Sequence, residues 1–279
     1  MLSTKSRSSV LFSVCFLLSG CASMEAVQKY ADSSRSTIES VRPVAEDFQA
    51  SCMRANSAKP LAYYSQCSTE QDVSKAILMV SNVLADYGAA LGSLAADELV
   101  NYDKDIDGLT EEIKKLKVKG IEDAKVSAIG SLAKFIAKAA TSAYQQKQVK
   151  TFLNESNSSL VSVTNTLADV INTNYSEAIK LEITSWEDSY QRVERVARNS
   201  NPLEWESYSK AQWKTRVELS EKLKAAKNLS ESINKIGATH TKLKNDANDL
   251  TGKEVAAMVK SFVNDTTPVI KEIKKAFAE

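Results

Sequence analysis

Glycine, proline and histidine are scarce in this chain, which narrows the folds and the chemistries open to it. The 279 residues include eight glycines, four prolines and one histidine. So few helix-breaking residues, in a chain rich in Ala, Lys, Glu, Leu and Ser, are typical of long helices. A single histidine, no glycine-rich phosphate loop and no Gly-x-Ser-x-Gly elbow leave the usual catalytic sets absent. We therefore expect no enzyme activity, no catalytic residues, no cofactor and no metal site.

An excess of charge of one sign is also missing, since the chain has 36 basic and 35 acidic residues. Nucleic-acid-binding proteins carry a clustered basic excess, so no nucleic-acid partner is expected. Strand-like alternation of useful length is absent too, whereas apolar residues recur every three or four positions along each long segment. This spacing predicts an all-α fold, an elongated, mostly antiparallel multi-helix bundle with coiled-coil-like seams.

The first 22 residues have a composition of their own. Lys5 and Arg7 precede the apolar stretch 10–18. This stretch is short for a transmembrane helix and is typical of a secretory signal peptide. The residues that follow it, Leu18-Ser19-Gly20-Cys21, resemble the lipobox of bacterial lipoproteins: a branched apolar residue, two small residues and a cysteine.

The resemblance covers residues 1–22 and implies a signal peptide over 1–20, cleavage before Cys21 and fatty acylation of that residue. The mature chain would then be one helical domain, 21–279, with 34 basic and 35 acidic residues once Lys5 and Arg7 are removed. Two or three acyl chains hold a protein stably on a membrane. Ala22 stands where inner-membrane lipoproteins tend to carry Asp. It implies the inner leaflet of the outer membrane, facing the periplasm.

Cys52 and Cys67 are the cysteines that remain after Cys15 is removed and Cys21 is acylated. Because the periplasm is oxidising, two free thiols would be unusual there. We predict a disulfide that closes the loop 52–67, worth up to about 3 kcal/mol in the chain-entropy model. Two reduced, buried cysteines are the alternative. A zinc site is not expected, because two cysteines without a nearby histidine fall short of a ligand set.

Apolar periodicity predicts the helix boundaries. One seam predicts a single helix over about 68–116. Within it, residues 103–108 imitate the start of a calcium-binding loop. Such a loop needs a glutamate at position twelve, which is Lys114 here. The helical spacing of apolar residues also continues through the segment, so we predict a solvated helix face. The polar segment 154–159 predicts a turn. Heptad spacing nevertheless continues through 154–159, and the alternative is one helix of more than 70 residues.

Two features of these seams predict packing. Gly88 and Gly92 place small residues on one side of their helix, where the Ala-rich segment 133–143 is the expected partner. His240 lies on a seam between two apolar positions. We interpret it as a histidine at the edge of the core, with a pH switch as the alternative.

Aromatic residues flank the clearest turn signal in the chain. Asn201 is a predicted N-cap, Pro202 occupies the first helical position and Glu204 follows. In the resulting antiparallel hairpin five aromatic residues would gather, namely Trp186, Tyr190, Trp205, Tyr208 and Trp213. Tryptophan and tyrosine dominate binding hot spots, so these residues are the candidate partner surface, with a packed bundle end as the alternative. A turn at 154–159 would place this end near the membrane.

The sequence therefore favours a non-enzymatic, lipid-anchored outer-membrane lipoprotein. Its partners would be the membrane, through Cys21, and another envelope protein, in an adaptor, envelope-assembly or inhibitor-type role. The alternative is a binding module for an apolar or cell-wall ligand held between helices. Such a module should contain a long void lined by residues such as Ile183, Trp186 and Leu219.

Overall fold

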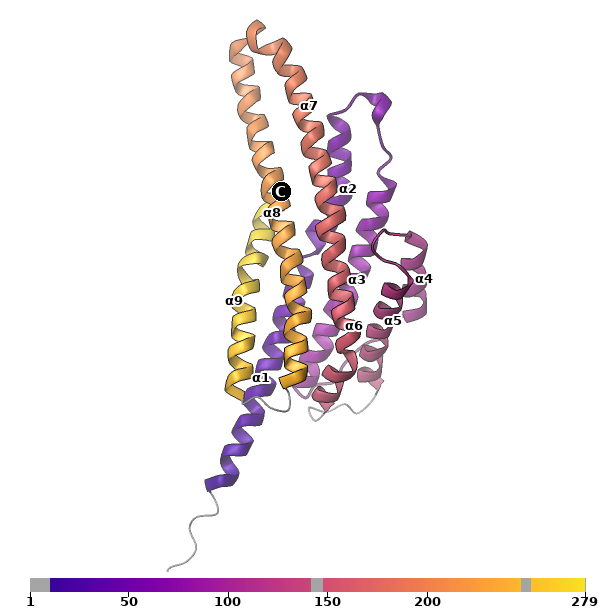
Figure 1. The fold of residues 1–279 in the computed structure, drawn as a ribbon, viewed down its shortest axis with the longest axis vertical. Coiled ribbons are helices and arrows are strands. Elements are labelled where there is room, and N and C mark those ends of the chain that lie inside the picture. The colour runs from indigo at the N-terminus through magenta and orange to yellow at the C-terminus, as the bar shows by residue number, and fades with distance from the viewer. Residues whose placement is uncertain (1–10, 142–147, 247–251, 279) are drawn as a thin grey trace, which may run out of the picture.

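The computed structural model describes residues 11–141, 148–246 and 252–278, with side chains from residue 24 onward. Every regular element in these ranges is helical, so the predicted all-α bundle is confirmed (Figure 1). The elements are α1 (Leu11–Glu39), α2 (Arg42–Ser57), the 3₁₀ turn η1 (Leu61–Tyr63), α3 (Ser68–Ala95), α4 (Ile106–Leu116), α5 (Asp123–Thr141), α6 (Val149–Val170), the π-helical turn η3 (Ile171–Tyr175), α7 (Ser176–Ser200), α8 (Pro202–Asp246) and α9 (Gly252–Ala276).

The helices run along the long axis of the molecule, and the chain reverses at its two ends and, between α4 and α5, part-way along (Figure 1). We call the end where α1 enters the bundle the base, and the opposite end the distal end. α1 and α2 lead from the base toward the distal end, and α3 returns beside them. α6 and α7 make the same ascent, and α8 descends. The α7–α8 hairpin and the α2–α3 connection therefore both lie at the distal end.

One continuous core of buried apolar side chains joins α1 through α9. Tyr30, Phe152 and Tyr175 are among the largest side chains that are wholly buried in it. By length and composition α3 could cross a membrane, but 61% of its most apolar window is buried inside the bundle. Its apolar character is therefore used in packing, mainly against α1 and α2.

The glycines of α3 face α1, so the prediction that they pack on 133–143 is wrong. A Cβ atom at Gly88 would lie 3.2 Å from the Ala31 carbonyl oxygen, and one at Gly92 would lie 3.6 Å from the Ala31 Cβ. α1 presents its own small side chain at this crossing, which lets the two backbones approach closely.

The single helix predicted over 68–116 is interrupted. α3 ends at Ala95, and a left-handed residue, Asp97, follows with φ of 60°. α4 begins only at Ile106, where the Asp105 carboxylate accepts a hydrogen bond from the Gly108 amide at 3.0 Å. The prediction of a solvated helix face over 103–108 therefore holds only for Asp107, in the exposed first turn of α4, because Asp103 lies in the connection and Asp105 is the N-cap. The apolar spacing persists because α3 and α4 bury their faces in the same core.

The turn predicted at 154–159 is also wrong, because α6 passes through this segment unbroken. Ser156 is wholly buried, and its hydroxyl lies 2.6 Å from the Phe152 carbonyl and 2.8 Å from the Tyr87 hydroxyl. Its polarity is therefore satisfied inside the core. The alternative helix of more than 70 residues is wrong as well, since α5 ends at Thr141 and packs beside α6.

His240 lies in the middle of the core and not at its edge. Its Nε2 atom is 2.6 Å from the Tyr87 hydroxyl and its Nδ1 atom is 2.8 Å from the Asn157 side-chain oxygen. Burial lowers the pKa of His240 to about 3, and the positive charge of Lys244 adds to this effect. The imidazole is therefore neutral at physiological pH. One of its ring nitrogens donates a hydrogen bond and the other accepts one, and Tyr87 and Asn157 supply the two partners.

Candidate functional site at the distal end

The α7–α8 hairpin begins where the sequence predicted its turn. The Asn201 amide donates to the Ala197 carbonyl at 3.0 Å and closes α7. Pro202 is the first residue of α8, and the Glu204 amide approaches the Asn201 side-chain oxygen at 3.5 Å. Local capping chemistry therefore fixes the point at which the chain reverses.

Four of the five predicted aromatic residues form one continuous cluster with Tyr190 at its centre. The Tyr190 ring centroid lies 5.4 Å from that of Trp186, 5.3 Å from Trp205 and 6.1 Å from Tyr208. Such contacts stabilise beyond simple burial by about 0.5–1.5 kcal/mol each. The polar atoms are paired across the hairpin as well, since the Trp186 indole donates to Gln212 at 2.5 Å and the Tyr190 hydroxyl contacts Ser209 at 2.9 Å. The cluster holds α7 and α8 together.

Trp213 lies outside that cluster and is exposed to solvent. It is 68% exposed and borders a groove of about 690 Å³, with Trp186 and Tyr190 on the opposite side and Val217 next to it. An ion pair between Glu187 and Arg216, at 3.0 Å, lies on the same groove. The hairpin thus presents an apolar depression with charged margins, the composition of a protein-binding surface.

A largely buried ionic network joins α7 and α8, on the side of the aromatic cluster away from the turn, to α2. Asp47, on α2, accepts hydrogen bonds from Lys222 and the Tyr175 hydroxyl, both at 2.7 Å, and pairs with Arg54 at 2.9 Å. Arg54 also binds Glu182, on α7, at 2.6 Å. Burial, followed by the negative charge of Asp47, raises the pKa of Tyr175 above its usual range. Sequence reasoning missed this network, because its members are far apart along the chain.

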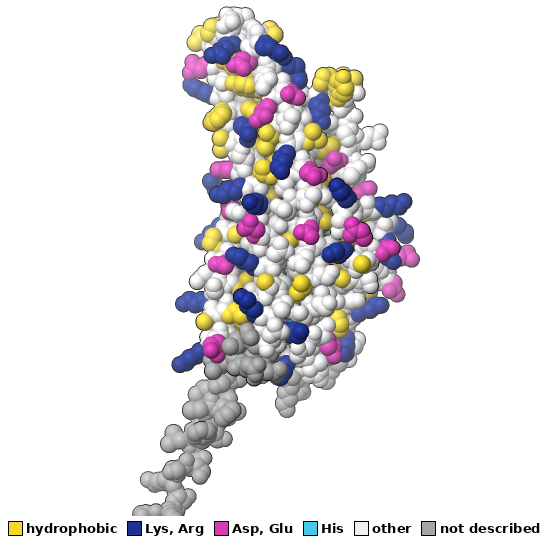
Figure 2. All heavy atoms as spheres, in the orientation of Figure 1, with side chains coloured by type: hydrophobic (Ala, Val, Ile, Leu, Met, Phe, Trp, Pro, Cys, Tyr) yellow, Lys and Arg dark blue, Asp and Glu magenta, His cyan; other side chains and the backbone are white. Residues whose placement is uncertain are grey.

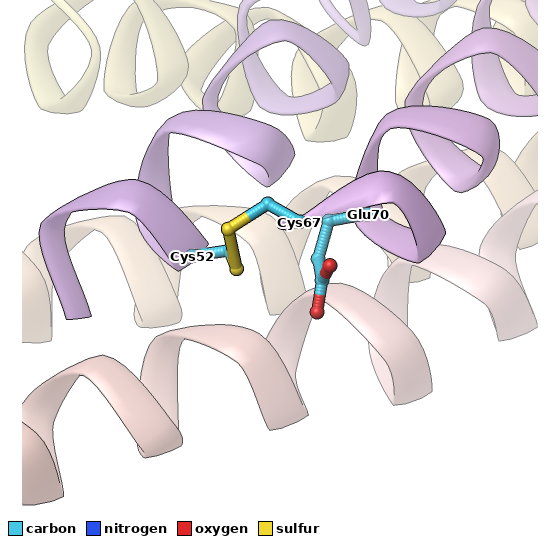
Figure 3. A group of neighbouring side chains, drawn as sticks. All are labelled: Cys52, Cys67 and Glu70. Carbon is cyan, nitrogen blue, oxygen red and sulfur yellow. A yellow bond between two sulfur atoms is a disulfide. The ribbon is translucent and has the colours of Figure 1, made fainter. Parts of the chain in front are cut away.

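The predicted disulfide between Cys52 and Cys67 is present and joins α2 to the start of α3, with a Cα–Cα distance of 5.9 Å (Figure 3). The Glu70 carboxylate lies beside it, and ligand atoms of these three residues are within 4.8 Å of one another. Thiolates, not disulfide sulfurs, are metal ligands. The oxidised pair therefore does not form a metal site with Glu70.

The disulfide region exposes an apolar tip that the sequence analysis missed. Leu61, Tyr63 and Tyr64 are 79%, 72% and 52% exposed. Figure 2 shows yellow apolar side chains both along the α7–α8 hairpin and at the end of the α2–α3 connection. The Arg192 guanidinium on α7 donates to the Ala58 carbonyl at 2.6 Å, so the two regions touch. Four consecutive apolar or aromatic residues between two cysteines, 61–64, were the available signal.

The aromatic hairpin lies at the end opposite the start of α1 (Figure 1). Its predicted place near the membrane depended on one helix over 68–116 and on a turn at 154–159. In the structure the chain passes straight through 154–159 but reverses between α3 and α4 and between α5 and α6, so the hairpin lies at the other end. Cys21 falls within the backbone range of α1, but its side chain lies outside the described part of the structure. Among the residues whose side chains are described, the first buried apolar one is Ala26, five positions after Cys21.

Of the residues named for a void between helices, Leu219 is packed in the core, whereas Trp186 borders the open groove beside Trp213. Leu219 is buried with 3% exposure, and Trp186 is fixed by its hydrogen bond to Gln212. A gap beside Tyr30, Tyr87 and Leu160 has a volume of about 10 Å³, which is too small for an acyl chain.

No protein-family model, curated protein or solved structure matches this chain.

Proposed function

We propose that this protein is a non-enzymatic lipoprotein of the bacterial outer membrane, held by acylated Cys21 in the inner leaflet and facing the periplasm. In this proposal the bundle is a rigid support that carries a protein-binding hairpin away from the bilayer. The lipobox-like segment supports the anchor. The groove beside Trp213 supports the interaction, because an exposed tryptophan on an apolar depression with charged margins has the residue type and setting of a binding hot spot.

The short distance from Cys21 to the core supports a fixed orientation. Met24 and Ala26 already pack against the core, so an acylated Cys21 would be joined to the bundle by about one helical turn and not by a long flexible linker. The base would then rest at the membrane surface, and the distal end would point into the periplasm. This geometry suits an adaptor, an assembly factor or an inhibitor of a periplasmic protein.

A photo-cross-linking residue at position 213 in intact cells tests the interaction. We expect one discrete protein adduct from position 213, and none from the matched exposed position 115 on α4, where the Lys115 side chain is 76% exposed. Val217→Glu, on the same groove, should lower the adduct yield at least about tenfold by placing a charge in an apolar contact. The same capture from both positions, or capture unchanged by Val217→Glu, would refute the hairpin as the partner surface.

Palmitate labelling tests the anchor independently. The chain should incorporate labelled palmitate, and Cys21→Ser should abolish incorporation. Labelling that survives this substitution would remove the anchor from the proposal and leave the hairpin result unaffected.

A further inference from the structure

The loop between α2 and α3 exposes several large apolar and aromatic side chains to solvent. We call residues 58–67 the clamped loop. It projects from the distal end and presents Leu61, Tyr63 and Tyr64 outward, with Lys59 as its one charged residue. A convex tip of this composition has no concave surface of its own to receive a ligand. A projecting tip of this kind can insert into a lipid bilayer or into a pocket of another protein.

The backbone of the clamped loop satisfies most of its own hydrogen-bond donors. The amides of Tyr63 and Tyr64 donate to the carbonyls of Pro60 and Leu61 at 2.9 and 3.2 Å. The amides of Lys59, Ser65 and Cys67 donate to the Asn56 carbonyl, the Asn56 side chain and the Ser65 hydroxyl. Pro60 has no amide hydrogen. In water these donors could bind solvent, whereas in a lipid environment each unsatisfied donor is costly.

Two further contacts fix the loop in position before it binds anything. The Asn56 amide group donates to the Ser65 carbonyl at 2.7 Å and completes a two-point clamp, and the Cys52–Cys67 disulfide closes the loop below it. Because the loop is already ordered, binding would cost little conformational entropy.

Basic side chains lie next to the tip, whereas the Glu70 carboxylate lies beside Cys67 at the disulfide-closed end of the loop. Lys59 lies in the loop, the Arg192 guanidinium binds its Ala58 carbonyl, and Arg195 follows three residues later on the same side of α7. No acidic residue lies within the clamped loop. Tyrosine and leucine at the tip with lysine and arginine behind it are the composition of proteins that bind the anionic interface of a bilayer.

We propose that the clamped loop is a lipid-binding tip, which inserts Leu61, Tyr63 and Tyr64 into the headgroup region of an anionic bilayer. This inference goes beyond the proposed function and does not depend on acylation of Cys21. On an anchored molecule, the tip would engage a bilayer other than the one that holds the base, because the two lie at opposite ends (Figure 1).

The test uses the purified full-length protein with a photo-cross-linking residue at position 63, mixed with vesicles of phosphatidylethanolamine and phosphatidylglycerol. Mass spectrometry should find phospholipid adducts at position 63 in at least about tenfold greater yield than at position 115. Leu61→Ser combined with Tyr64→Ser should lower the yield at position 63 about tenfold. Leu99→Ser, at a side chain that is 92% exposed on the α3–α4 connection, is the matched control and should leave it unchanged.

Equal lipid adduct yields at positions 63 and 115 would overturn the proposal, as would a yield that survives the Leu61 and Tyr64 substitutions. The same cross-linker used in intact cells separates the two classes of partner. A protein adduct at position 63 in place of a lipid adduct would assign the loop to a protein interface and also overturn the proposal. Failure here leaves the capture at position 213 intact, so the two proposals fail separately.

Discussion

The imidazole of His240 connects the stability of the core to pH. Its pKa is lowered to about 3 in the folded chain by burial, against about 6.5 when unfolded. Below the unfolded pKa the unfolded chain binds a proton that the folded chain excludes, so stability falls as pH falls from about 6.5 toward about 3. We expect the free energy of unfolding to drop by about 2 kcal/mol between pH 7 and pH 5 from this one residue.

Urea unfolding of the full chain at both pH values measures this drop. His240→Gln is the matched variant, because it keeps a polar side chain for Tyr87 and Asn157 but does not titrate. Its stability should change by less than about 0.5 kcal/mol over the same interval, since most carboxylates titrate at lower pH. Equal pH slopes in the two proteins would show that His240 is not the responsible group.

Residue roles could be predicted from the sequence only where their causes are local. Asn201 and Pro202 define a turn through neighbouring residues, and Cys52 and Cys67 were left as a pair by simple elimination. Asp47 could not be identified in this way. Its partners Tyr175 and Lys222 are 128 and 175 residues away, and no periodicity within α2 reveals which side chain they will surround.

The ionic network should set how firmly the hairpin is held to α2. Asp47→Asn would leave Lys222 and Arg54 with a neutral neighbour in a largely buried site. We expect a loss of about 2–3 kcal/mol, below the range for a fully buried pair because Arg54 stays partly exposed. Amide exchange should accelerate over the first turns of α7. Glu46→Gln, at an exposed i,i+4 pair on the same helix, should change stability by less than about 0.5 kcal/mol.

The crossing of α6 and α8 depends on a glycine. A Cβ atom at Gly237 would lie 2.6 Å from the Thr164 hydroxyl oxygen, which is bound to the Leu160 carbonyl at 2.9 Å and cannot easily move. Overpacking costs about 1–3 kcal/mol, and the gain in helix propensity returns about 1 kcal/mol. Gly237→Ala should therefore lower stability by up to about 2 kcal/mol in urea unfolding.

Gly92→Ala provides a control of opposite sign. The added methyl group would meet Ala31 and Asp32 at 3.6 and 3.7 Å, which is ordinary contact, so only the propensity gain remains. We expect unchanged stability or a gain of up to about 1 kcal/mol. If both alanine variants moved stability in the same direction, close packing at Gly237 would not be the cause.

Helix identity could be predicted from apolar spacing, but two helix ends could not. Residues 154–159 look like a turn because they are polar, yet Ser156 finds its partners in the core, on α3 and on its own helix. Residues 96–105 look helical because α3 and α4 both place apolar side chains in one core. In each case the deciding interaction is tertiary, which apolar spacing along one segment does not record.

The orientation of the whole molecule was predicted incorrectly for the same reason. Each chain reversal changes which end of a bundle the next turn occupies. A reversal between α5 and α6 replaces the turn predicted at 154–159, and the additional reversal between α3 and α4 moves the aromatic hairpin to the other end. The unbroken ascent through α6, η3 and α7 carries the chain from Val149 to Ser200. At about 1.5 Å per residue this ascent is about 75–80 Å long. The aromatic residues could be identified from sequence, but their distance from the start of α1, and so from the proposed anchor, could not.

This length leads to a prediction for the anchored protein in vesicles of neutral phosphatidylcholine. A donor fluorophore at position 253, at the base, should transfer energy strongly to acceptor-labelled lipids. One at position 203, at the distal turn, should transfer at least about tenfold less, because about 75 Å exceeds the usual range of transfer. Lys253 and Leu203 both lie in the first turn of a helix and are exposed, so label mobility is matched.

Neutral lipid removes the attraction of the clamped loop for anionic headgroups. Similar transfer from both positions would mean that the bundle lies flat on the bilayer, and the hairpin would then be presented beside the membrane and not away from it.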